Sequence, residues 1–477
     1  MTNQREVEIG EVCELINGRA FKPEEWEEDG LPIVRIQNLN NQTAPFNHYS
    51  KPVKDRYYID DGELLFAWSG TPGTSFGAHI WRGGRAILNQ HIYRVLVDPE
   101  EVDKHFFKYA INHKLNALIR KAHGGGGLQH VTKGKFESTA IQPPPLPQQR
   151  RIVQTLDELT ARADGAEAHL SAIPPLVDKF KKSLLARAFS GELTREWRAE
   201  HPDVEPASEL LERIRPERRK KWVHNYAANL ADRAEKRADK KGEPFDQEDW
   251  QAYYDKKIPQ GEDRYEEPEG VDPEEEDLPE IPETWEWVRF ATLGELSRGK
   301  SRHRPRNDPK LFGGSFPFVQ TGDIAAAKGK LLDATEYYNE TGLQQSRLFP
   351  ESTVCITIAA NIADSAILGI PACFPDSVVG FISDDLTHVD PEFIEFFIRS
   401  IKYKLEYSAA SATAQKNINL GILRQIAVPL PPIEEQNTIV ESVRSEFQAI
   451  SRAREQAGTS RAKLNQLRSS LLADLLG

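Results

Sequence analysis

The residues of this chain whose types suit chemistry are polar side chains in predicted turns, and they recur at matching places in its two halves. In the first half they are Arg35, Gln37, Asn38, Asn40, Trp68, Ser69, Thr71, Gln129, His130, Thr132 and Lys133. In the second half they are Gln320, Thr321, Asn361, Gln415, Lys416, Asn417 and Asn419. Asn and Gln can bind adenine through two hydrogen bonds, Arg and Lys can bind guanine, and Ser and Thr can bind a base or a phosphate. A single polar loop residue is usually only part of the surface, but the paired recurrence predicts DNA recognition.

A short basic segment in the second half adds a candidate site for phosphates. It contains Lys300, Arg302 and Arg304, with His303 and Arg306 beside them. Lys and Arg neutralise the phosphates of a duplex and supply affinity that does not depend on base sequence. We therefore expect Lys300, Arg302 and Arg304 to bind DNA.

Catalytic and metal-binding motifs are missing from the sequence. An amino-methyltransferase would need an Asn/Asp-Pro-Pro-aromatic tetrapeptide, and neither Gln142–Pro145 nor Leu430–Ile433 fits it. The glycine-rich run Gly124–Lys135 differs from a Walker phosphate loop in spacing, and Phe136 follows its last Gly-Lys pair. The histidines of the first half include no His-x3-His pair, and the cysteines include no Cys-x2-Cys pair. The sequence therefore predicts a non-catalytic chain without a metal or cofactor of its own.

The charge of the chain is unevenly distributed, and this decides whether nucleic acid can be a partner. The formal net charge is -12. Residues 241–283 hold 17 Asp and Glu against 4 Lys and Arg, a net charge of -13, so the rest of the chain carries about +1. A nearly neutral body can present basic faces, so the overall charge does not exclude DNA.

The sequence is that expected of a cytoplasmic protein. Its three cysteines support no disulfide framework, and its first residues lack the apolar core of a signal peptide. The most apolar stretch, Val354–Phe374, has Asn361 and Asp364 at its centre. Polar residues there favour a pair of buried strands over a membrane span.

The chain repeats itself at an offset of 287 residues. Residues 145–153 read PLPQQRRIV and residues 432–440 read PIEEQNTIV, so Gln149 falls on Gln436 at that offset. Such a duplication predicts a pseudo-dimer on one polypeptide, and a pseudo-dimer suits a target that has two halves.

Each repeated segment follows a region with short strand-like runs and turn signals. In the first region the predicted strands are Ile33–Ile36, Glu63–Trp68 and Ile92–Val97, and the predicted helix is Lys104–Arg120. In the second region the predicted strands are Phe316–Gln320 and Val354–Ile358, and the predicted helix is Glu392–Tyr407. The same order with different surface residues predicts one fold that carries two specificities.

Each repeated segment also opens a helix with a heptad pattern. The apolar positions of the first helix are Ile152, Leu156, Leu159, Ala163, Ala166, Leu170, Ile173, Val177, Phe180 and Leu184. Those of the second are Ile439, Val443, Ile450, Ala453, Ala457, Leu464, Leu467, Leu471 and Leu475. Neither helix can bury such a stripe alone, so we expect the two, each about 60 Å long, to pack antiparallel as a coiled coil. At Pro174 and Pro175 we expect a kink or a short break in the first helix.

A charged insert separates the first helix from the second domain. Residues 207–236 predict a charged helix, with Leu210, Leu211 and Ile214 as its thin apolar stripe. Residues 261–282 are rich in proline and acidic residues, which predicts an extended linker.

Several short phrases make the chain resemble a specificity subunit of a type I restriction-modification system. The phrases are PLPQQRRIV and PPIEEQNTIV at the helix starts, FSGELT at 189–194, ASELLERIR at 207–215 and LPEIPETWEWV at 278–288. None of them is specific alone, but together they span essentially the whole chain in the order domain, helix, domain, helix.

The resemblance implies an α+β fold with a pseudo-twofold internal repeat. Two similar α/β target-recognition domains, at 1–147 and 284–430, would be joined by two long antiparallel coiled-coil helices at 148–190 and 431–477. A helical, acidic insert would occupy 191–283.

The resemblance also implies what the chain binds. Each domain would read one half of a split, asymmetric sequence in double-stranded DNA. The spacer helices would fix the gap between the halves and dock two methyltransferase subunits, and the restriction and translocase subunits would join that core. S-adenosylmethionine, ATP and Mg would be held by those partners and not by this chain. Two alternatives remain: a fused, self-sufficient DNA methyltransferase-nuclease, which the missing motifs disfavour, and a coiled-coil protein adaptor without DNA binding.

Overall fold

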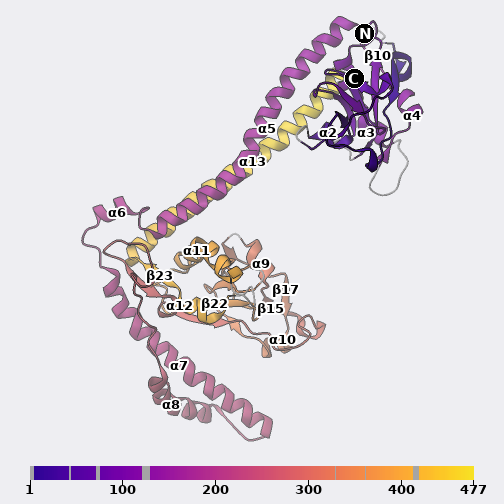
Figure 1. The fold of residues 1–477 in the computed structure, drawn as a ribbon. Coiled ribbons are helices and arrows are strands. Elements are labelled where there is room, and N and C mark those ends of the chain that lie inside the picture. The colour runs from indigo at the N-terminus through magenta and orange to yellow at the C-terminus, as the bar shows by residue number, and fades with distance from the viewer. Residues whose placement is uncertain are drawn as a thin grey trace. The chain divides into compact units, whose positions relative to one another are not determined.

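The computed structural model describes residues 5–41, 44–70, 76–120, 129–327, 329–359, 361–411 and 418–476. The chain forms two compact units, an N-terminal unit (Met1–Ile173 with Glu455–Gly477) and a central unit (Pro174–Arg454) (Figure 1). Each unit contains one sheet-rich globule and part of each long helix. The long helices are α5 (Leu146–Phe189) and α13 (Ile433–Leu476), of 44 residues each.

The N-terminal unit is built on two four-stranded sheets, in the orders β2-β10-β6-β8 and β4-β3-β9-β5. Its strands are β1 (Val7–Glu8), β2 (Cys13–Asn17), β3 (Leu31–Val34), β4 (Asn47–Tyr49), β5 (Tyr58–Ile59), β6 (Leu64–Ala67), β7 (Ser69–Gly70), β8 (Gly77–Ile80), β9 (Ala86–Leu88), β10 (Ile92–Val97), β11 (Gln129–His130) and β12 (Ala140–Ile141). Its other helices are α1 (Ile9–Val12), α2 (Ile36–Asn40), α3 (Lys104–Arg120) and α4 (Lys133–Glu137).

The central unit has sheets in the orders β14-β22-β19-β20-β16 and β17-β15-β21-β18. Its strands are β13 (Glu286–Arg289), β14 (Gly294–Arg298), β15 (Phe312–Phe318), β16 (Lys330–Leu331), β17 (Glu336–Tyr338), β18 (Leu348–Phe349), β19 (Val354–Thr357), β20 (Ser365–Leu368), β21 (Ala372–Cys373), β22 (Val378–Ser383) and β23 (Ala427–Leu430). Its other helices are α6 (Arg195–Glu200), α7 (Ala207–Lys241), α8 (Gln247–Arg264), α9 (Thr321–Ala326), α10 (Glu340–Gln344), α11 (Pro391–Ser411) and α12 (Leu420–Gln425).

The two units share one topology. The order β2-β10-β6-β8 recurs as β14-β22-β19-β20, and β4-β3-β9-β5 recurs as β17-β15-β21-β18. In the second sheet of each unit one pair is parallel, β3 with β9 and β15 with β21. The predicted duplication of one fold is therefore confirmed. The predicted pair of buried strands within Val354–Phe374 is the antiparallel pair β19 and β20.

Each core is formed by aromatic and aliphatic side chains between the first sheet and the helix that follows it. Phe66 and Phe107 are fully buried in the N-terminal unit, and Phe381 and Phe393 are fully buried in the central unit. Burial of one such side chain contributes about 1.5–3 kcal/mol to folding. The alternating apolar residues of the strands and the apolar face of α3 or α11 supply these contacts.

The equivalent glutamines of the repeat fasten the first turn of each long helix to its own globule. Gln149 and Gln436 are both fully buried. Gln149 Nε2 donates to the carbonyl oxygen of Pro144 at 2.7 Å, and Gln436 Nε2 donates to that of Pro431 at 3.0 Å. Each amide also bonds to the loop before α3 or α11. The repeated sequence thus marks the junction between helix and globule.

The two long helices run antiparallel in both units. In the N-terminal unit Glu167 of α5 forms an ion pair with Arg461 of α13 at 2.6 Å. In the central unit Lys181 of α5 lies 5.3 Å from the ring centre of Phe447 of α13. As the residue number rises along α5 it falls along α13, so the predicted antiparallel pairing is confirmed.

The heptad seam is buried at its ends and open in places between them. Ile152 and Ile439 pack into the two cores. Phe180 remains 47% exposed and Leu467 remains 61% exposed. A pair of helices covers only one flank of each apolar stripe, so these side chains stay in contact with solvent.

Pro174 and Pro175 lie inside α5, and the helix is continuous across them. The expected short break is therefore not found, and the expected kink stays a prediction. The fixed φ of proline is compatible with a helix, and the cost is the loss of backbone donors to the preceding turn.

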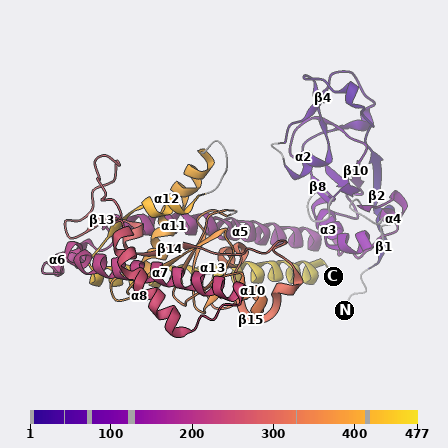
Figure 2. The same ribbon diagram turned by 90° about the horizontal axis from the view of Figure 1, so that it is seen from below.

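The insert at 191–283 contains α6, α7 and α8, of which α7 and α8 lie side by side as a hairpin (Figures 1 and 2). The predicted apolar stripe of α7, with Leu210 and Ile214 in it, is buried in the core of the central unit. Helix α8 is not among the predicted helices. Its sequence signal is Asp246, whose side chain accepts from Asp249 N at 3.0 Å and begins the helix.

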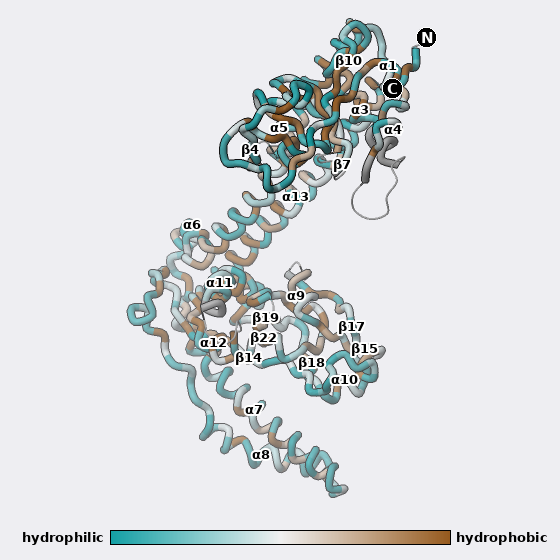
Figure 3. The backbone as a smooth tube through the Cα atoms, turned by 45° about the vertical axis from the view of Figure 1, so that its right-hand side comes forward, coloured by the Kyte–Doolittle hydropathy of each residue, from teal (hydrophilic) through white to brown (hydrophobic). Residues whose placement is uncertain are grey.

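The hydropathy of the backbone follows this division. The hairpin of α7 and α8 is largely hydrophilic, whereas hydrophobic segments concentrate in the sheets and along parts of the long helices (Figure 3). Among the described helices, none has both the length and the apolar character required to cross a bilayer.

Candidate nucleic-acid interface

The same turn follows β3 and β15, where the first candidate residues lie. Arg35 N donates to Asn38 Oδ1 at 3.1 Å, and Gln320 N donates to Asp323 Oδ2 at 2.8 Å. Each bond holds the start of a short helix, α2 or α9. The two predicted segments are therefore equivalent in geometry as well as in sequence order.

Side chains at the turn after β3 divide into exposed and structural ones. Gln37 is exposed, and the guanidinium of Arg35 lies 5.0 Å from the ring centre of Trp26. Asn38 is only 1% exposed and donates to two carbonyl oxygens of the following loop. We therefore assign Asn38 to holding the loop, which leaves Arg35 and Gln37 as candidates for base contacts.

The second set of candidates is brought together by a short strand pair. β7 pairs with β11, which places Ser69 opposite His130. The backbone N of Val131 donates to Trp68 O at 3.2 Å, and the Trp68 ring stacks on Tyr93 at 6.1 Å between centroids. Ser69 itself is buried. The backbones of two segments far apart in the sequence thus lie side by side in the N-terminal unit.

The central unit repeats one hydrogen bond of this arrangement. Ile418 N donates to Ile358 O at 3.1 Å, the counterpart of the bond between Val131 and Trp68. The next residue, Asn419, is the N-cap of α12, just as Thr132 is the N-cap of α4. Outside the described part of the chain lie Thr71, Gln415, Lys416, Asn417 and the side chains of Asn40, Gln129 and His130.

The two turns of each unit lie near a shared part of its fold. Val34 and Ala67, which precede Arg35 and Trp68, belong to one buried cluster. In the central unit α9 packs on β19 and β20, whose connecting loop carries Asn361. Asn361 is exposed and has a φ of 57°, in the left-handed region. In the N-terminal unit the turn after β3 and the segment that begins at Trp68 therefore adjoin one buried cluster, and in the central unit α9 lies beside the two strands whose loop carries Asn361.

The remaining candidates make contacts at the surface. Lys133 is exposed and lies 3.6 Å from Glu137, and Thr321 is half-buried at the start of α9. The side chain of Gln320 donates to Glu336. These partners are exposed or half-buried carboxylates, so the Lys133 and Gln320 contacts are open to competition from a ligand.

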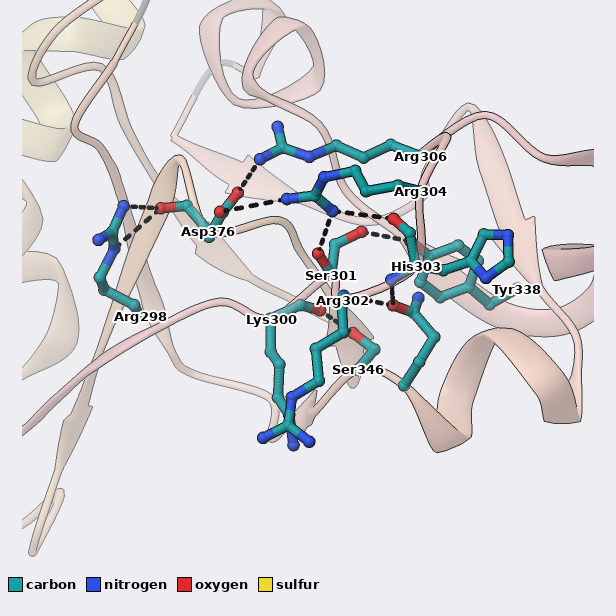
Figure 4. Close-up of polar contacts among 11 residues, drawn as sticks. Arg298, Lys300, Ser301, Arg302, His303, Arg304, Arg306, Tyr338, Ser346 and Asp376 are labelled. Atoms are coloured by element: carbon teal, nitrogen blue, oxygen red, sulfur yellow. Dashed lines mark hydrogen bonds and ion pairs between the residues drawn. The ribbon is translucent and has the colours of Figure 1, made fainter.

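The basic loop, residues 298–306, is organised by Asp376 (Figure 4). The Asp376 carboxylate forms ion pairs with Arg306 at 2.5 Å and with Arg304 at 3.9 Å, and its carbonyl oxygen accepts from Arg298 at 2.9 Å. The predicted phosphate contact of Arg304 would therefore share its charge with Asp376.

Lys300 and Arg302 differ from these arginines. Arg302 N donates to Gln345 Oε1 at 2.6 Å, and the carbonyl oxygen of Lys300 accepts from Ser346 Oγ at 2.7 Å. Their backbone is thus fixed, while neither side chain takes part in an ion pair within the described residues. Two positive charges are held in place and remain available to an anion.

Positive side chains of helix α7 act on Lys300 together with those of the basic loop. Burial lowers the pKa of Lys300, and the positive charges of Arg302, Lys236, Arg233 and Arg347 lower it further. Arg233 and Lys236 belong to α7 and are absent from the predicted site residues. A single sequence contains no signal that would place this helix beside the basic loop.

The cysteine thiols and the possible metal ligands of the described residues bear on the chemistry of these surfaces. Burial raises the pKa of Cys13 to about 12 and also raises that of Cys355, so both thiols are protonated and weak nucleophiles at neutral pH. Within the described ranges no group of His, Cys, Asp and Glu could hold a metal ion. Hydrogen-bond donors and uncompensated positive charge suit a polyanion.

The fold and these turns define a duplicated protein, in which each unit carries polar residues on equivalent turns. Residues 1–172 and 282–456 match the family described as type I restriction modification DNA specificity domain. The chain belongs to this family.

Named relatives span nearly all of the chain. The type I restriction enzyme EcoBI specificity subunit of Escherichia coli is 24% identical over 98% of this chain and 84% of its own length. The putative MjaX specificity subunit of Methanocaldococcus jannaschii is 25% identical over 92% of this chain and 85% of its own length.

Solved structures support the fold. The crystal structure of the HsdS subunit from Thermoanaerobacter tengcongensis aligns with a TM-score of 0.55 at 16% identity, covering 99% of this chain and 96% of that one. A chain from a study of complex assembly and conformational transition in the type I R-M system aligns with a TM-score of 0.64 at 16% identity, covering 99% and 97%.

These similarities confirm the predicted class. The chain is a non-catalytic DNA specificity subunit of a type I restriction-modification system, with the predicted α+β fold. The alternatives, a fused methyltransferase-nuclease and an adaptor without DNA binding, gain no support from the relatives.

Proposed function

We propose that the chain reads a split, asymmetric sequence in double-stranded DNA, one half with each unit. The observation that carries this proposal is the repetition of one turn geometry with different side chains. Arg35 and Gln37 occupy one turn, and Gln320 and Thr321 occupy its equivalent. Different donors and acceptors on the same scaffold read different base edges in the major groove.

The proposed DNA contacts include the other candidate residues at the edges of the units. They are Trp68, Thr71, Gln129, His130, Thr132 and Lys133 in the first domain, and Lys300, Arg302, Arg304, Asn361, Gln415, Lys416, Asn417 and Asn419 in the second. Ser69 is left out because it is buried, as Asn38 is. In this proposal Lys300 and Arg302 contact phosphates, because they are fixed at the backbone and no described residue forms an ion pair with either.

We also propose that α5 and α13 set the gap between the half-sites and carry two methyltransferase subunits, which the restriction subunits join. A groove of about 230 Å³ between these helices in the N-terminal unit supports a protein contact, because it is lined by Leu156, Leu159, Ala163, Leu464 and Leu467. S-adenosylmethionine, ATP and Mg would be held by the partner subunits, and the assembly would work in the cytoplasm.

Exchange of one domain tests independent reading of the two half-sites. We expect replacement of residues 1–147 by the equivalent domain of another family member to change one half of the methylated sequence and to leave the other half unchanged. Methylome sequencing of cells that carry the hybrid subunit with its methyltransferase partner measures this directly. Altered bases in both halves would contradict the proposal.

Removal of charge from the basic loop tests the phosphate contacts. We expect Lys300→Gln with Arg302→Gln to weaken DNA binding by the assembled methyltransferase and to make the dependence of log K on log salt shallower by about 1.8, since each phosphate contact contributes about 0.9. The methylated sequence should not change, because phosphates carry no base identity. A changed recognition sequence would instead show that these residues contact bases.

A further inference from the structure

Helix α7 of the insert runs beside the chain segment that leads into the basic loop. Arg218 Nε donates to the carbonyl oxygen of Ala291 at 3.1 Å, and Asn225 Nδ2 donates to Glu295 Oε2 at 3.1 Å. The two segments therefore advance in the same direction. Beyond Glu295, the chain continues along β14 to Lys300.

Residues farther along α7 reach the level of the basic loop. From Asn225 to Arg233 the helix advances about 12 Å at 1.5 Å per residue. From Glu295 to Lys300 an extended chain advances about 16 Å at 3.3 Å per residue. The effect of the charges of Arg233 and Lys236 on Lys300 agrees with this placement.

The last turns of α7 carry a basic face. Arg233, Lys236, Arg237 and Lys240 are all exposed, and their spacing of three and four residues places them on one side of the helix. The opposite side is fixed by burial of Ala231 and Ala238. The orientation of the basic face is therefore set by packing.

The ion pairs among the described residues do not use the first two of these basic side chains. Neither Arg233 nor Lys236 takes part in an ion pair within the described residues. Asp232, one turn before Lys236, accepts instead from Trp250 Nε1 at 3.0 Å. Glu295, on the strand that leads into the loop, pairs with Arg347 at 2.7 Å, and Asp376 pairs with Arg304 and Arg306.

Like charges held together by two elements repel one another, and an external polyanion would remove that repulsion. The phosphates of one DNA strand follow each other every 3.4 Å or so of helix axis, so neighbouring phosphates can engage two adjacent basic groups. Lys300 and Arg302 already offer one such group at the edge of the central unit.

We propose that the end of α7 is an additional DNA-binding arm, in which Arg233 and Lys236 contact backbone phosphates next to those held by Lys300 and Arg302. This inference rests on the proposed phosphate contacts of the basic loop. It gives the insert a role that the two domains do not require for reading bases: affinity that is independent of sequence. The acidic residues of the insert lie mainly beyond α7, so the arm presents positive charge despite the negative charge of the segment.

The test compares two double variants of the full chain, each assembled with its methyltransferase partner. One is Arg233→Gln with Lys236→Gln, and the other is Lys220→Gln with Lys256→Gln, which removes two exposed positive charges elsewhere on the hairpin. Binding to a duplex with the recognition sequence and to a scrambled duplex is measured between about 50 and 200 mM salt.

We expect the Arg233 and Lys236 variant to bind both duplexes more weakly, by the same factor for each. The slope of log K against log salt concentration should become shallower by about 1.8, and the methylated sequence should stay unchanged. The Lys220 and Lys256 variant should keep the salt dependence of the original chain. If the Lys300 and Arg302 variant changes the salt dependence and the Arg233 and Lys236 variant does not, the proposal that α7 binds DNA is wrong. The proposed phosphate contacts of the basic loop are then still supported.

Two other outcomes would also contradict the proposal that the end of α7 binds DNA. If neither the Arg233 and Lys236 variant nor the Lys300 and Arg302 variant changes the salt dependence, the DNA-binding face lies elsewhere. The proposed phosphate contacts of the basic loop are then wrong as well. If the Arg233 and Lys236 variant impairs assembly with the methyltransferase subunits and leaves the DNA affinity of the assembled fraction unchanged, α7 is a protein contact.

Discussion

Deletion of one heptad from each long helix is expected to shorten the gap between the two half-sites by about three base pairs. Seven residues account for about 10 Å of helix, and base pairs are stacked about 3.4 Å apart. Suitable deletions are 164–170 in α5 and 458–464 in α13, which are centred on the ion pair between Glu167 and Arg461. A seven-residue deletion keeps the heptad phase, so both half-site sequences should be retained. Methylome sequencing of cells that carry the variant measures the gap.

The matched controls separate length from damage. Deletion in only one helix shifts the antiparallel seam and removes the partner of Glu167 or Arg461, so we expect loss of methylation at every site. Insertion of one heptad into both helices should lengthen the gap by about the same three base pairs. An unchanged gap in the double deletion would show that the helices do not set the spacing.

The duplicated architecture could be predicted from sequence because the repeat is fixed by packing. Gln149 and Gln436 are kept at one offset since each fastens a helix to a globule through the same buried bonds. The heptads could be predicted because burial has a period along the helix. The equivalence of the two turns could be predicted from their place after matching strands, and it is confirmed by their hydrogen bonds.

The sequence predicts less well which candidate side chains are free to contact DNA, because this depends on neighbours that are far apart in the sequence. Asn38 looks like an adenine-binding residue in the sequence, and the structure buries it within its own loop. Arg304 looks like a free cation, and Asp376 lies beside it only in the folded chain. Arg233 and Lys236 of α7 lower the pKa of Lys300 only because the fold brings α7 near it, and no local sequence pattern reveals this.

The family phrases could be recognised in the sequence, but their physical reason appears only in the fold. Three of them meet at the buried carboxylate of Glu435, which is fully inaccessible. Thr194 Oγ1 donates to it at 2.5 Å, Trp285 Nε1 donates at 2.8 Å, and Arg198 forms an ion pair with it. These residues come from the start of the insert, the start of the second domain and the first turn of α13. The network therefore closes the insert onto the long helix.

Replacement of Glu435 by alanine is expected to destabilise the central unit by about 3–5 kcal/mol, because it leaves the Arg198 guanidinium mostly buried without its counter-charge. That is a large part of the 5–15 kcal/mol or so by which a typical domain is stable. Urea unfolding of the full chain, followed by tryptophan fluorescence, measures the loss. The repeat supplies the control: Gln148 is the residue equivalent to Glu435 in the first copy and is exposed, so Gln148→Ala should change stability by no more than about 0.5 kcal/mol. Equal, small effects of the two substitutions would mean that the carboxylate does not hold the insert in place.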